Sequence, residues 1–271
     1  MSSMDSTPST GIAEAADRLR GALRTGRPTT PVRDLIGSDD ISAAYATQRL
    51  VNADRLAAGV TVVGRKIGLT SPAVQRQLGV DRPDFGVLFE DMAYDDGATI
   101  DFAQVMQPKV EAEVAFVLDA DLAEGPLDAA QVRAAIGRVH PALEICGSRI
   151  ANWDITFGDT VADNASAGAY VLGTGHRSLD EVEPREVTMR MTVDGTEVSS
   201  GDGTACLGDP IEAVVWLARQ VRGLGAPLRA GEVVLSGALG PMHAVGPGDT
   251  VTATLSGLGE VTIGFSPSSA Q

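Results

Sequence analysis

Cysteine and histidine are scarce in this 271-residue chain, which has two cysteines, Cys146 and Cys206, and three histidines. No C-x-x-C pair occurs, and His140, His176 and His243 lack the spacing of metal ligands. These absences argue against a zinc ribbon and against a disulfide scaffold. The low cysteine content also favours a reducing, cytoplasmic compartment.

Positively charged residues are also few relative to acidic ones. Lysine and arginine number 21 against 36 acidic residues, which gives a formal net charge of −15. Nucleic acids and anionic membrane surfaces require a basic footprint, so neither is expected as a partner. The apolar stretches, such as residues 213–218, are too short to predict a membrane span. The first ten residues have neither the basic nor the apolar region of a signal peptide.

The motifs of several enzyme classes are missing. There is no G-x-G-x-x-G after a predicted strand, no phosphate-binding P-loop and no G-x-S-x-G. The sequence therefore gives no support to nucleotide binding or to serine hydrolase chemistry.

The patterning that is present predicts helices first and strands afterwards. Apolar residues at helical spacing predict helices at about 12–25 and 41–58, the second capped by Asp39 or Asp40. A late helix is predicted after Asp209, with Pro210 at its first position. Because strands do not alternate regularly with helices, a doubly wound parallel sheet is not expected. Short apolar runs between Gly, Pro and Asp predict strands at 61–69, 86–89, 110–118, 169–173, 187–193, 232–236, 250–255 and 260–265.

Two carboxylates stand out on the strand predicted at 110–118. Side chains alternate between the faces of a strand, so Glu111 and Glu113 point the same way. A solvated strand face is one interpretation. The residues that follow are apolar on both faces, however, which predicts that the strand enters the core, where two charges need a counter-charge. A hard divalent cation is the natural one.

A third carboxylate, Glu144, lies in another mostly apolar strand. It could complete a set of oxygen ligands. An octahedral magnesium ion held by three carboxylates would keep positions for water and for substrate oxygens. The alternative is a structural ion pair between Glu144 and Arg149 or Arg138.

Three further charged residues are candidates for the same site. Strand alternation sends Arg65 and Lys66 to opposite faces, and an exposed cation is the common outcome. A lysine near a carboxylate cluster could instead bind an anionic substrate or move protons. Asp84 stands in Arg-Pro-Asp-Phe-Gly, where it could equally be a turn residue.

Five segments (64–70, 82–89, 108–116, 142–152 and 159–166) together resemble the 2-hydroxypenta-2,4-dienoate hydratases, also called 2-keto-4-pentenoate hydratases. These enzymes belong to the fumarylacetoacetate hydrolase superfamily. The resemblance covers about residues 12–265. It depends on the E-x-E strand combined with a distant third Glu and with the Asp-Asn-Ala-Ser block that ends at Ser166.

This resemblance implies an α+β fold, a β-rich roll of mixed sheets with an α-helical N-terminal segment. We expect a disordered N-terminus at 1–10, a helical segment at 11–59, a β-rich catalytic domain at 60–265 and a flexible tail at 266–271. The resemblance also implies roles for individual residues: Glu111, Glu113 and Glu144 as ligands of Mg²⁺ or Mn²⁺, Lys66 and Asp84 as the catalytic pair, and Ser166 as a substrate contact. Arg65 is a further candidate substrate contact, because its positive charge could attract an anionic substrate.

The implied reaction adds water to a 2-hydroxy-2,4-dienoate in the meta-cleavage degradation of aromatic compounds. Protonation at C5 gives an α,β-unsaturated ketone, and water then adds at C4 to give a 4-hydroxy-2-oxo acid. The sister 2-oxo-3-hexenedioate decarboxylase, an acylpyruvate-type C–C hydrolase and a non-catalytic scaffold for the sister enzyme are the alternatives. The resemblance further implies a homo-oligomer, with association with a sister pathway enzyme as another expectation.

Overall fold

The N-terminal part of the protein is helical. The computed structural model describes residues 9–71, 75 and 80–267, and it opens with helices α1 (Thr10–Thr25), α2 (Arg33–Ile36) and α3 (Ile41–Ala57). Helix α1 ends at Gly26, which adopts the left-handed conformation that glycine tolerates best. Helix α3 begins after Asp40, whose side chain accepts a hydrogen bond from the Ala43 amide at 3.0 Å. Both helices predicted in this region are confirmed.

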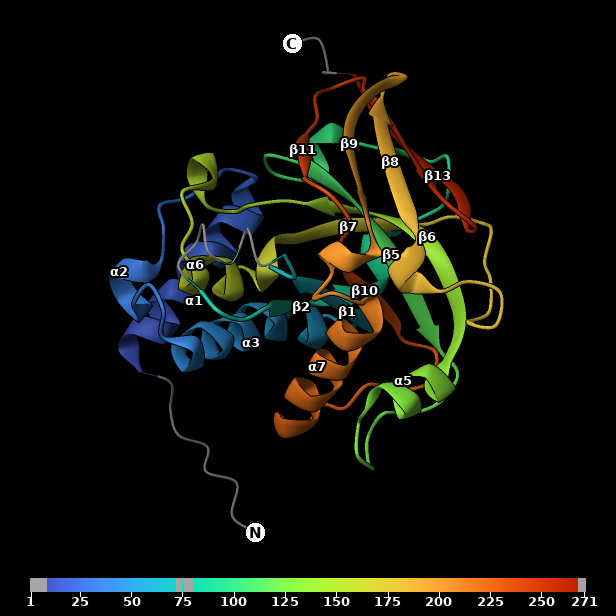
Figure 1. Ribbon diagram of the computed structural model, residues 1–271. Coiled ribbons are helices and arrows are strands. Elements are labelled where there is room, and N and C mark those ends of the chain that lie inside the picture. The colour runs from blue at the N-terminus through green and yellow to red at the C-terminus, as the bar shows by residue number, and fades with distance from the viewer. Residues whose placement is uncertain (1–8, 72–74, 76–79, 268–271) are drawn as a thin grey trace.

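A mixed eight-stranded sheet forms the centre of the protein (Figure 1). Its order is β2-β1-β10-β5-β6-β7-β3, and the short β11 also pairs with β5. Strand β1 runs parallel to β10, whereas β10, β5, β6 and β7 are successively antiparallel. The bounds are β1 Val62–Gly68, β2 Asp84–Phe89, β3 Ala93–Tyr94, β5 Lys109–Leu118, β6 Ile136–Cys146, β7 Ala167–Leu172, β10 Val233–Ala238 and β11 His243–Ala244.

A second, five-stranded sheet packs against the first. Its order is β4-β13-β12-β8-β9, and strands β12 and β13 contact β6 of the central sheet. Strand β12 shows the period-two alternation that made it predictable, because Val251, Ala253 and Leu255 are buried. The bounds are β4 Thr99–Ile100, β8 Thr188–Val193, β9 Thr196–Asp202, β12 Thr250–Leu255 and β13 Gly259–Phe265.

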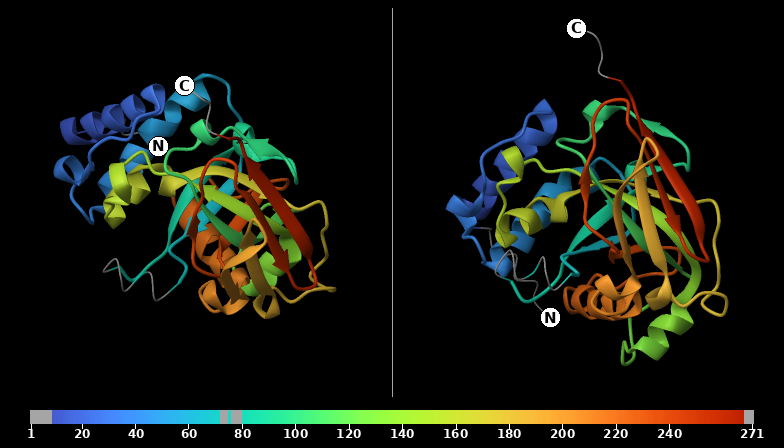
Figure 2. Two further views of the ribbon diagram at one scale, coloured as in Figure 1. Left: turned by 90° about the horizontal axis from the view of Figure 1, so that it is seen from above. Right: turned by 45° about the horizontal axis from the view of Figure 1, so that its top comes forward.

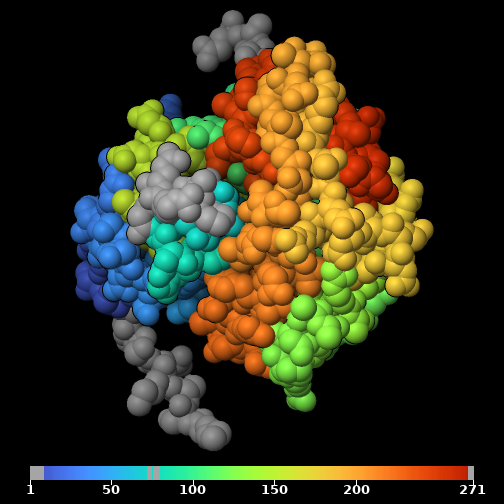
Figure 3. Space-filling model, in the orientation of Figure 1, coloured from blue at the N-terminus to red at the C-terminus, as the bar shows by residue number. Residues whose placement is uncertain are grey.

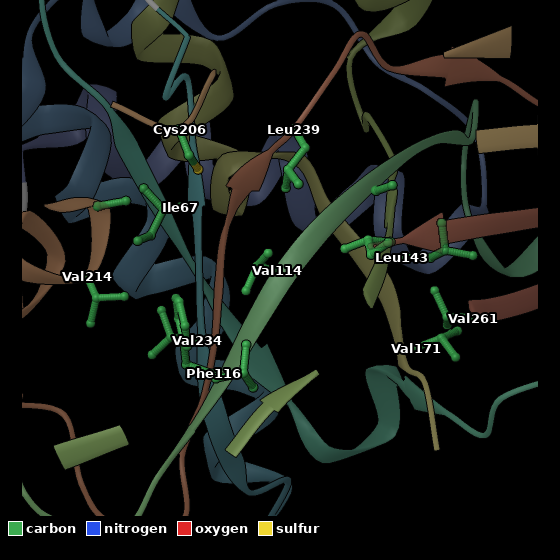
Figure 4. Close-up of a cluster of buried hydrophobic side chains, with 14 of the residues drawn as sticks. Ile67, Val114, Phe116, Leu143, Val171, Cys206, Val214, Val234, Leu239 and Val261 are labelled. Carbon is green, nitrogen blue, oxygen red and sulfur yellow. The ribbon is translucent and has the colours of Figure 1, made fainter. Parts of the chain in front are cut away.

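The two faces of the central sheet belong to different hydrophobic cores. One face, with Val114 and Phe116 of β5, packs into the largest core together with the second sheet and helix α7 (Pro210–Gly223) (Figure 4). The other face carries Ala115, Ala142 and Leu235 and forms a smaller cluster. Because the even- and odd-numbered residues of β5 face opposite cores, the sheet can bury charged residues on one side without placing them in the main core.

A third core joins the N-terminal helices to a later segment. Helices α1 and α3 pack with α6 (Phe157–Ala162) around Leu19, Val51 and Val161. Figures 1 and 2 show this helical group beside the β-rich body, with α5 (Ala129–Ala135) lying away from it. In the space-filling view the N-terminal residues, in blue, lie on the left of the molecule and the C-terminal residues, in orange and red, on the right (Figure 3).

The predicted α+β class, a β-rich roll with an N-terminal helical segment, is confirmed. Strand β9 escaped prediction because its residues are mostly polar and exposed. The expected disordered ends lie mainly outside the described residues. The last residue of the expected N-terminal disorder, Thr10, instead begins α1. The first residue of the expected flexible tail, Ser266, accepts a hydrogen bond from the Phe102 amide. Among the described residues no helix combines the length and the apolar character needed to cross a bilayer.

One buried carboxylate ties α6 to the N-terminal helices. Asp159 is completely buried and accepts hydrogen bonds from the amides of Val32 and Arg33 at 2.8 and 2.9 Å. Its second oxygen accepts from the amide and the hydroxyl of Thr156, the residue that caps α6. A single side chain therefore satisfies donors from two segments that are far apart in the sequence.

Replacing this residue, Asp159→Ala, is expected to lower the free energy of unfolding by roughly 3 kcal/mol, because each buried donor left unpaired costs roughly 1–3 kcal/mol. The matched control is Asp154→Ala. Asp154 also pairs with Arg33, at 2.7 Å, but its side chain is 66% exposed, so its loss should cost less than about 1 kcal/mol. Urea unfolding measures both variants, and equal midpoints would contradict the anchoring role of Asp159.

Candidate active site

The three glutamates singled out in the sequence lie on one face of the central sheet. Strands β5 and β6 are antiparallel, and Glu111 stands directly opposite Glu144 in their register. Glu113 lies two residues further along β5, on the same face, and pairs with Ala142 of β6. Glu113 and Glu144 are 0% exposed, and Glu111 is half-buried. The solvated strand face is therefore wrong as an interpretation of this strand.

Lys66 reaches the same cluster from β1. Its ammonium Nζ lies 3.1 Å from Oε1 of Glu144 and donates a hydrogen bond to the carbonyl of Ala165 at 2.9 Å. Glu144 thus does form an ion pair, but the partners considered from the sequence were wrong. Arg149 instead pairs with Asp163, and Arg138 is exposed.

Asp84 completes the charged group as the first residue of β2. It is 1% exposed and pairs in the β1–β2 register with Gly68, two residues from Lys66. A Cβ atom on Gly68 would lie 2.2 Å from Oδ1 of Asp84 and 3.4 Å from Nζ of Lys66, so the missing side chain leaves room for both groups. The interpretation of Asp84 as a turn residue is therefore wrong.

The charges of this group do not balance. Four carboxyl groups (Asp84, Glu111, Glu113 and Glu144) face the single ammonium group of Lys66. Buried side-chain oxygens of three of them lack a partner: Oδ1 of Asp84, Oε1 of Glu113 and Oε2 of Glu144, whose Oε1 is paired with Lys66. Unpaired buried anions are costly, so the group requires protons or a cation.

The pKa values respond to this imbalance. Burial, reinforced by Glu144, raises the pKa of Glu111 to about 7 and that of Glu113 well above its usual value. Burial likewise raises the pKa of Asp84 to about 6, although Lys66 opposes the shift. For Lys66 burial acts to lower the pKa, but the surrounding acidic groups, led by Glu144, raise it well above the ordinary lysine value. The lysine therefore stays charged, whereas the carboxylates need a stronger counter-charge.

This donor set fits a hard divalent cation. Carboxylate oxygens are the ligands that Mg²⁺ and Mn²⁺ prefer, and the unpartnered oxygens of Glu113 and Glu144 are free to bind one. The half-buried Glu111 places the site at the margin of the buried region.

Arg65 does not join the cluster. It is buried on the opposite face of β1, where its Nη1 lies 3.8 Å from Oε1 of Glu232 and donates to the carbonyl of Gly64. Burial lowers its pKa, and Glu232 opposes the shift. We expected one of the two neighbouring cations, Arg65 or Lys66, to be exposed, but both are buried. Nothing in the geometry supports the expectation that Arg65 contacts the substrate.

Ser166 lies in the turn that covers the lysine. The turn is the short 3₁₀ element η4 (Asn164–Ser166), and Asn164, Ala165 and Ser166 all have positive φ angles of 51–56°. Such a run is strained for residues other than glycine and is typical of functional sites. The Ser166 hydroxyl is buried and lies 3.2 Å from the hydroxyl of Thr160.

The amide of Asn164 fastens this turn to the edge of the sheet. Its Oδ1 accepts a hydrogen bond from the Val87 amide and its Nδ2 donates to the Val87 carbonyl, both at 2.9 Å. Asn52 of α3 donates to the same Oδ1 at 3.0 Å. Gly86 permits the close approach, because a Cβ there would lie 2.3 Å from the Asn164 carbonyl. These contacts hold the turn against β2 and α3, and the turn carries the Ala165 carbonyl that accepts the Lys66 hydrogen bond.

Two further groups at the site were missed from the sequence. The Gly237 amide donates a hydrogen bond to Oε2 of Glu113 at 2.8 Å, from a point where the pairing of β10 with β5 shifts register. No sequence signal predicted that shift. The other is Cys146, which lies 3.8 Å from Oε2 of Glu111. Here a signal existed, since Cys146 shares its strand face with Glu144.

The histidines lie elsewhere. His140 is buried on β6, its Nδ1 is 3.0 Å from the Gly173 carbonyl, and its ring lies near that of the exposed His176. Burial lowers the pKa of His140. His243 belongs to the two-residue strand β11, which pairs with Val110 and Lys109 at the start of β5.

Comparison with known proteins places this site in a family. Residues 61–265 match the family described as fumarylacetoacetate (FAA) hydrolase C-terminal. The chain is 52% identical to the "TodF product hydratase" of Pseudomonas putida, over 98% of this chain and 99% of the relative. It is also 52% identical to a 2-keto-4-pentenoate hydratase of Paraburkholderia xenovorans, over 93% and 94% of the two chains.

A solved structure agrees with these sequence relatives. The 4-oxalocrotonate decarboxylase from Pseudomonas putida G7, complexed with magnesium and adipate, superposes with a TM-score of 0.89 and 32% identity. The match covers 94% of this chain and 97% of that one. The chain therefore belongs to the fumarylacetoacetate hydrolase family and, within it, groups with the 2-keto-4-pentenoate hydratases.

Proposed function

We propose that this protein is a metal-dependent hydro-lyase that adds water to a 2-hydroxy-2,4-dienoate, giving a 4-hydroxy-2-oxo acid in the breakdown of aromatic compounds. The observation that carries the proposal is the buried cluster of Glu111, Glu113 and Glu144 beside Lys66 and Asp84. Support comes from hydratase-named relatives that are 52% identical over nearly the whole chain.

Glu111, Glu113 and Glu144 are the proposed ligands of a divalent metal ion. A solved relative binds magnesium, and this donor set suits Mg²⁺ or Mn²⁺. When bound, such an ion supplies Lewis acidity toward the oxygens of a 2-oxo or 2-hydroxy carboxylate. Gly237 holds one oxygen of Glu113, which leaves the unpartnered Oε1 available as the ligand atom.

Lys66 and Asp84 are the proposed proton-transfer pair. Lys66 remains an ammonium group that can stabilise negative charge on the substrate and donate a proton. The pKa of Asp84, raised to about 6, lies near neutrality, where a carboxyl group can both accept and release protons. In the reaction C5 gains one proton, the 2-hydroxyl loses one, and water then adds as OH at C4 and H at C3.

Ser166 remains a proposed substrate contact. Its support is its place in η4 directly after Ala165, whose carbonyl binds Lys66. The hydroxyl already lies near Thr160, so a substrate oxygen would share or replace that contact. Arg65 is not retained in this role, because it pairs with Glu232 on the other face.

A decarboxylase is the second candidate. The magnesium-bound decarboxylase structure supports it, because the fold match extends over 94% of this chain. The hydratase relatives are more similar in sequence, at 52% against 32% identity, and therefore favour water addition. A non-catalytic scaffold is less well supported, since all the charged residues of the site are present.

Product analysis separates these candidates. Purified protein loaded with Mg²⁺ or Mn²⁺ is given freshly prepared 2-hydroxypenta-2,4-dienoate or 2-oxo-3-hexenedioate. We expect the first substrate to yield 4-hydroxy-2-oxopentanoate and the second to release no carbon dioxide. Carbon dioxide release without hydration would assign the decarboxylase, and inactivity on both substrates would favour the scaffold.

Assembly and location remain proposals. We propose a homo-oligomer, since most oligomers are built from identical chains, and an association with a sister pathway enzyme. A cytoplasmic location is consistent with two free cysteines, both of them buried.

A further inference from the structure

The side chain of Cys146 lies inside the carboxylate cluster although it is not needed for the proposed magnesium site. Cys146 is 3% exposed and follows Glu144 by two residues on the same face of β6. Its register partner is Lys109 of β5, which extends away over the ring of Trp153, 4.3 Å from the ring centroid. The thiol is therefore left facing Glu111, with Sγ 3.8 Å from Oε2.

Three potential ligand atoms converge at this point. Sγ of Cys146 and one carboxylate oxygen each of Glu111 and Glu144 all lie within 4.8 Å of one another. Oε1 of the completely buried Glu144 is paired with Lys66, but its Oε2 has no partner and is therefore available to a metal ion. Ligand atoms around one zinc ion lie roughly 3.5 Å apart, given bonds of about 2.0–2.3 Å. Small side-chain movements would bring the three atoms to that spacing.

This set differs in chemical character from the three glutamates. Carboxylates alone favour hard ions such as Mg²⁺ and Mn²⁺, whereas a sulfur ligand favours borderline and soft ions such as Zn²⁺ and Cd²⁺. We propose that Glu111, Glu144 and Cys146 form a second metal-binding set that overlaps the first and takes up Zn²⁺ or Cd²⁺. Because Glu111 and Glu144 are shared, a thiophilic ion and Mn²⁺ cannot occupy the site together.

Binding of the thiophilic ion involves no change of oxidation state. The thiol proton leaves to solvent as the sulfur lone pair forms the bond to the ion, and the carboxylates of Glu111 and Glu144 complete three of four positions. The inference rests on the proposed metal-binding role of these two glutamates. It does not depend on which reaction the protein catalyses.

Cadmium binding tests the proposal without an activity assay. Metal-free protein is titrated with Cd²⁺, and the ultraviolet charge-transfer absorption of a cadmium–thiolate bond is recorded. We expect one equivalent of Cd²⁺ per chain to produce the band. Cys146→Ser and Cys146→Ala should both abolish it and weaken Cd²⁺ binding by at least roughly the 10–100-fold typical of a lost supporting group at a metal site. Cys206→Ser is the matched control and should keep the band.

Displacement of manganese completes the test. Electron paramagnetic resonance distinguishes free from bound Mn²⁺, and Cd²⁺ should release Mn²⁺ from the wild-type protein at equimolar amounts. A band that persists in both Cys146 variants, or no band in the wild type, would overturn the inference even if Mn²⁺ binds. A band that appears without Mn²⁺ displacement would overturn the shared-ligand arrangement. Failure of Mn²⁺ to bind at all, with the cadmium band present, would instead contradict the proposed magnesium site.

Discussion

Glu144→Gln is expected to abolish metal-dependent activity and to lower the affinity for Mg²⁺ or Mn²⁺ by at least roughly 10–100-fold. Glu144 stands at the centre of the cluster, opposite Glu111; its Oε1 lies 3.1 Å from Lys66 and its Oε2 has no partner. Glutamine keeps the shape of the side chain but removes the charge that a divalent cation requires. Isothermal titration of metal-free protein measures the loss of affinity directly.

The same substitution should affect stability in a way that a general folding defect would not. Without metal, the variant loses the ion pair with Lys66 but also removes one of several mutually repelling buried anions, so its free energy of unfolding should stay close to that of the wild type. Wild-type protein gains stability as Mg²⁺ saturates it, because the ion binds only the folded state. The variant should lose that gain.

The exposed residue Glu212 on α7 provides the control. Glu212→Gln should behave as the wild type in metal titration and in unfolding with and without Mg²⁺. A Glu144→Gln variant that still binds Mg²⁺ with wild-type affinity would remove this residue from the ligand set.

Lys66→Met is expected to lower kcat by about 100- to 10,000-fold, the range typical of lost general acid–base catalysis. Methionine retains most of the apolar stem and loses the ammonium group that donates to the Ala165 carbonyl. Metal affinity should stay equal or increase, because a positive charge 3.1 Å from a proposed ligand is removed. Steady-state kinetics at saturating metal, together with metal titration, separate the two effects.

The chain contains one other lysine, Lys109, which makes the comparison well matched. It lies at the start of β5 on the same face but extends over Trp153. Lys109→Met should therefore reduce kcat far less than Lys66→Met. If Lys66→Met lost metal binding and kcat in proportion, Lys66 would be a structural support of the metal site and not a proton donor.

Side-chain alternation was enough to predict much of this site. It placed Glu111 and Glu113 on one face and Lys66 and Arg65 on opposite faces, as the structure shows. It could not predict which strands are neighbours. Strand β10, from late in the sequence, lies between β1 and β5, so Lys66 on β1 meets Glu144 on β6 across two intervening strands.

The partners of buried charges were harder to predict than their positions. Arg149 stood close to Glu144 in the sequence, yet it binds Asp163, the residue that follows α6. The Ala165 carbonyl and the Gly237 amide are backbone groups, so residue type gives no signal for them. Cys146 lies two residues after Glu144, so alternation places both on one face of β6. A buried cysteine, however, more often behaves as a small apolar residue than as a ligand.

The side-chain amide of Asn164 has a consequence for the behaviour of the protein in concentrated solution. It satisfies the Val87 amide and carbonyl on β2, the outermost strand of the central sheet, as a neighbouring strand would do. An uncovered outer strand is a template on which other chains can add and aggregate. The turn that holds the acceptor of Lys66 therefore also shields the sheet from intermolecular strand addition, so damage that loosens this turn would threaten solubility and catalysis together.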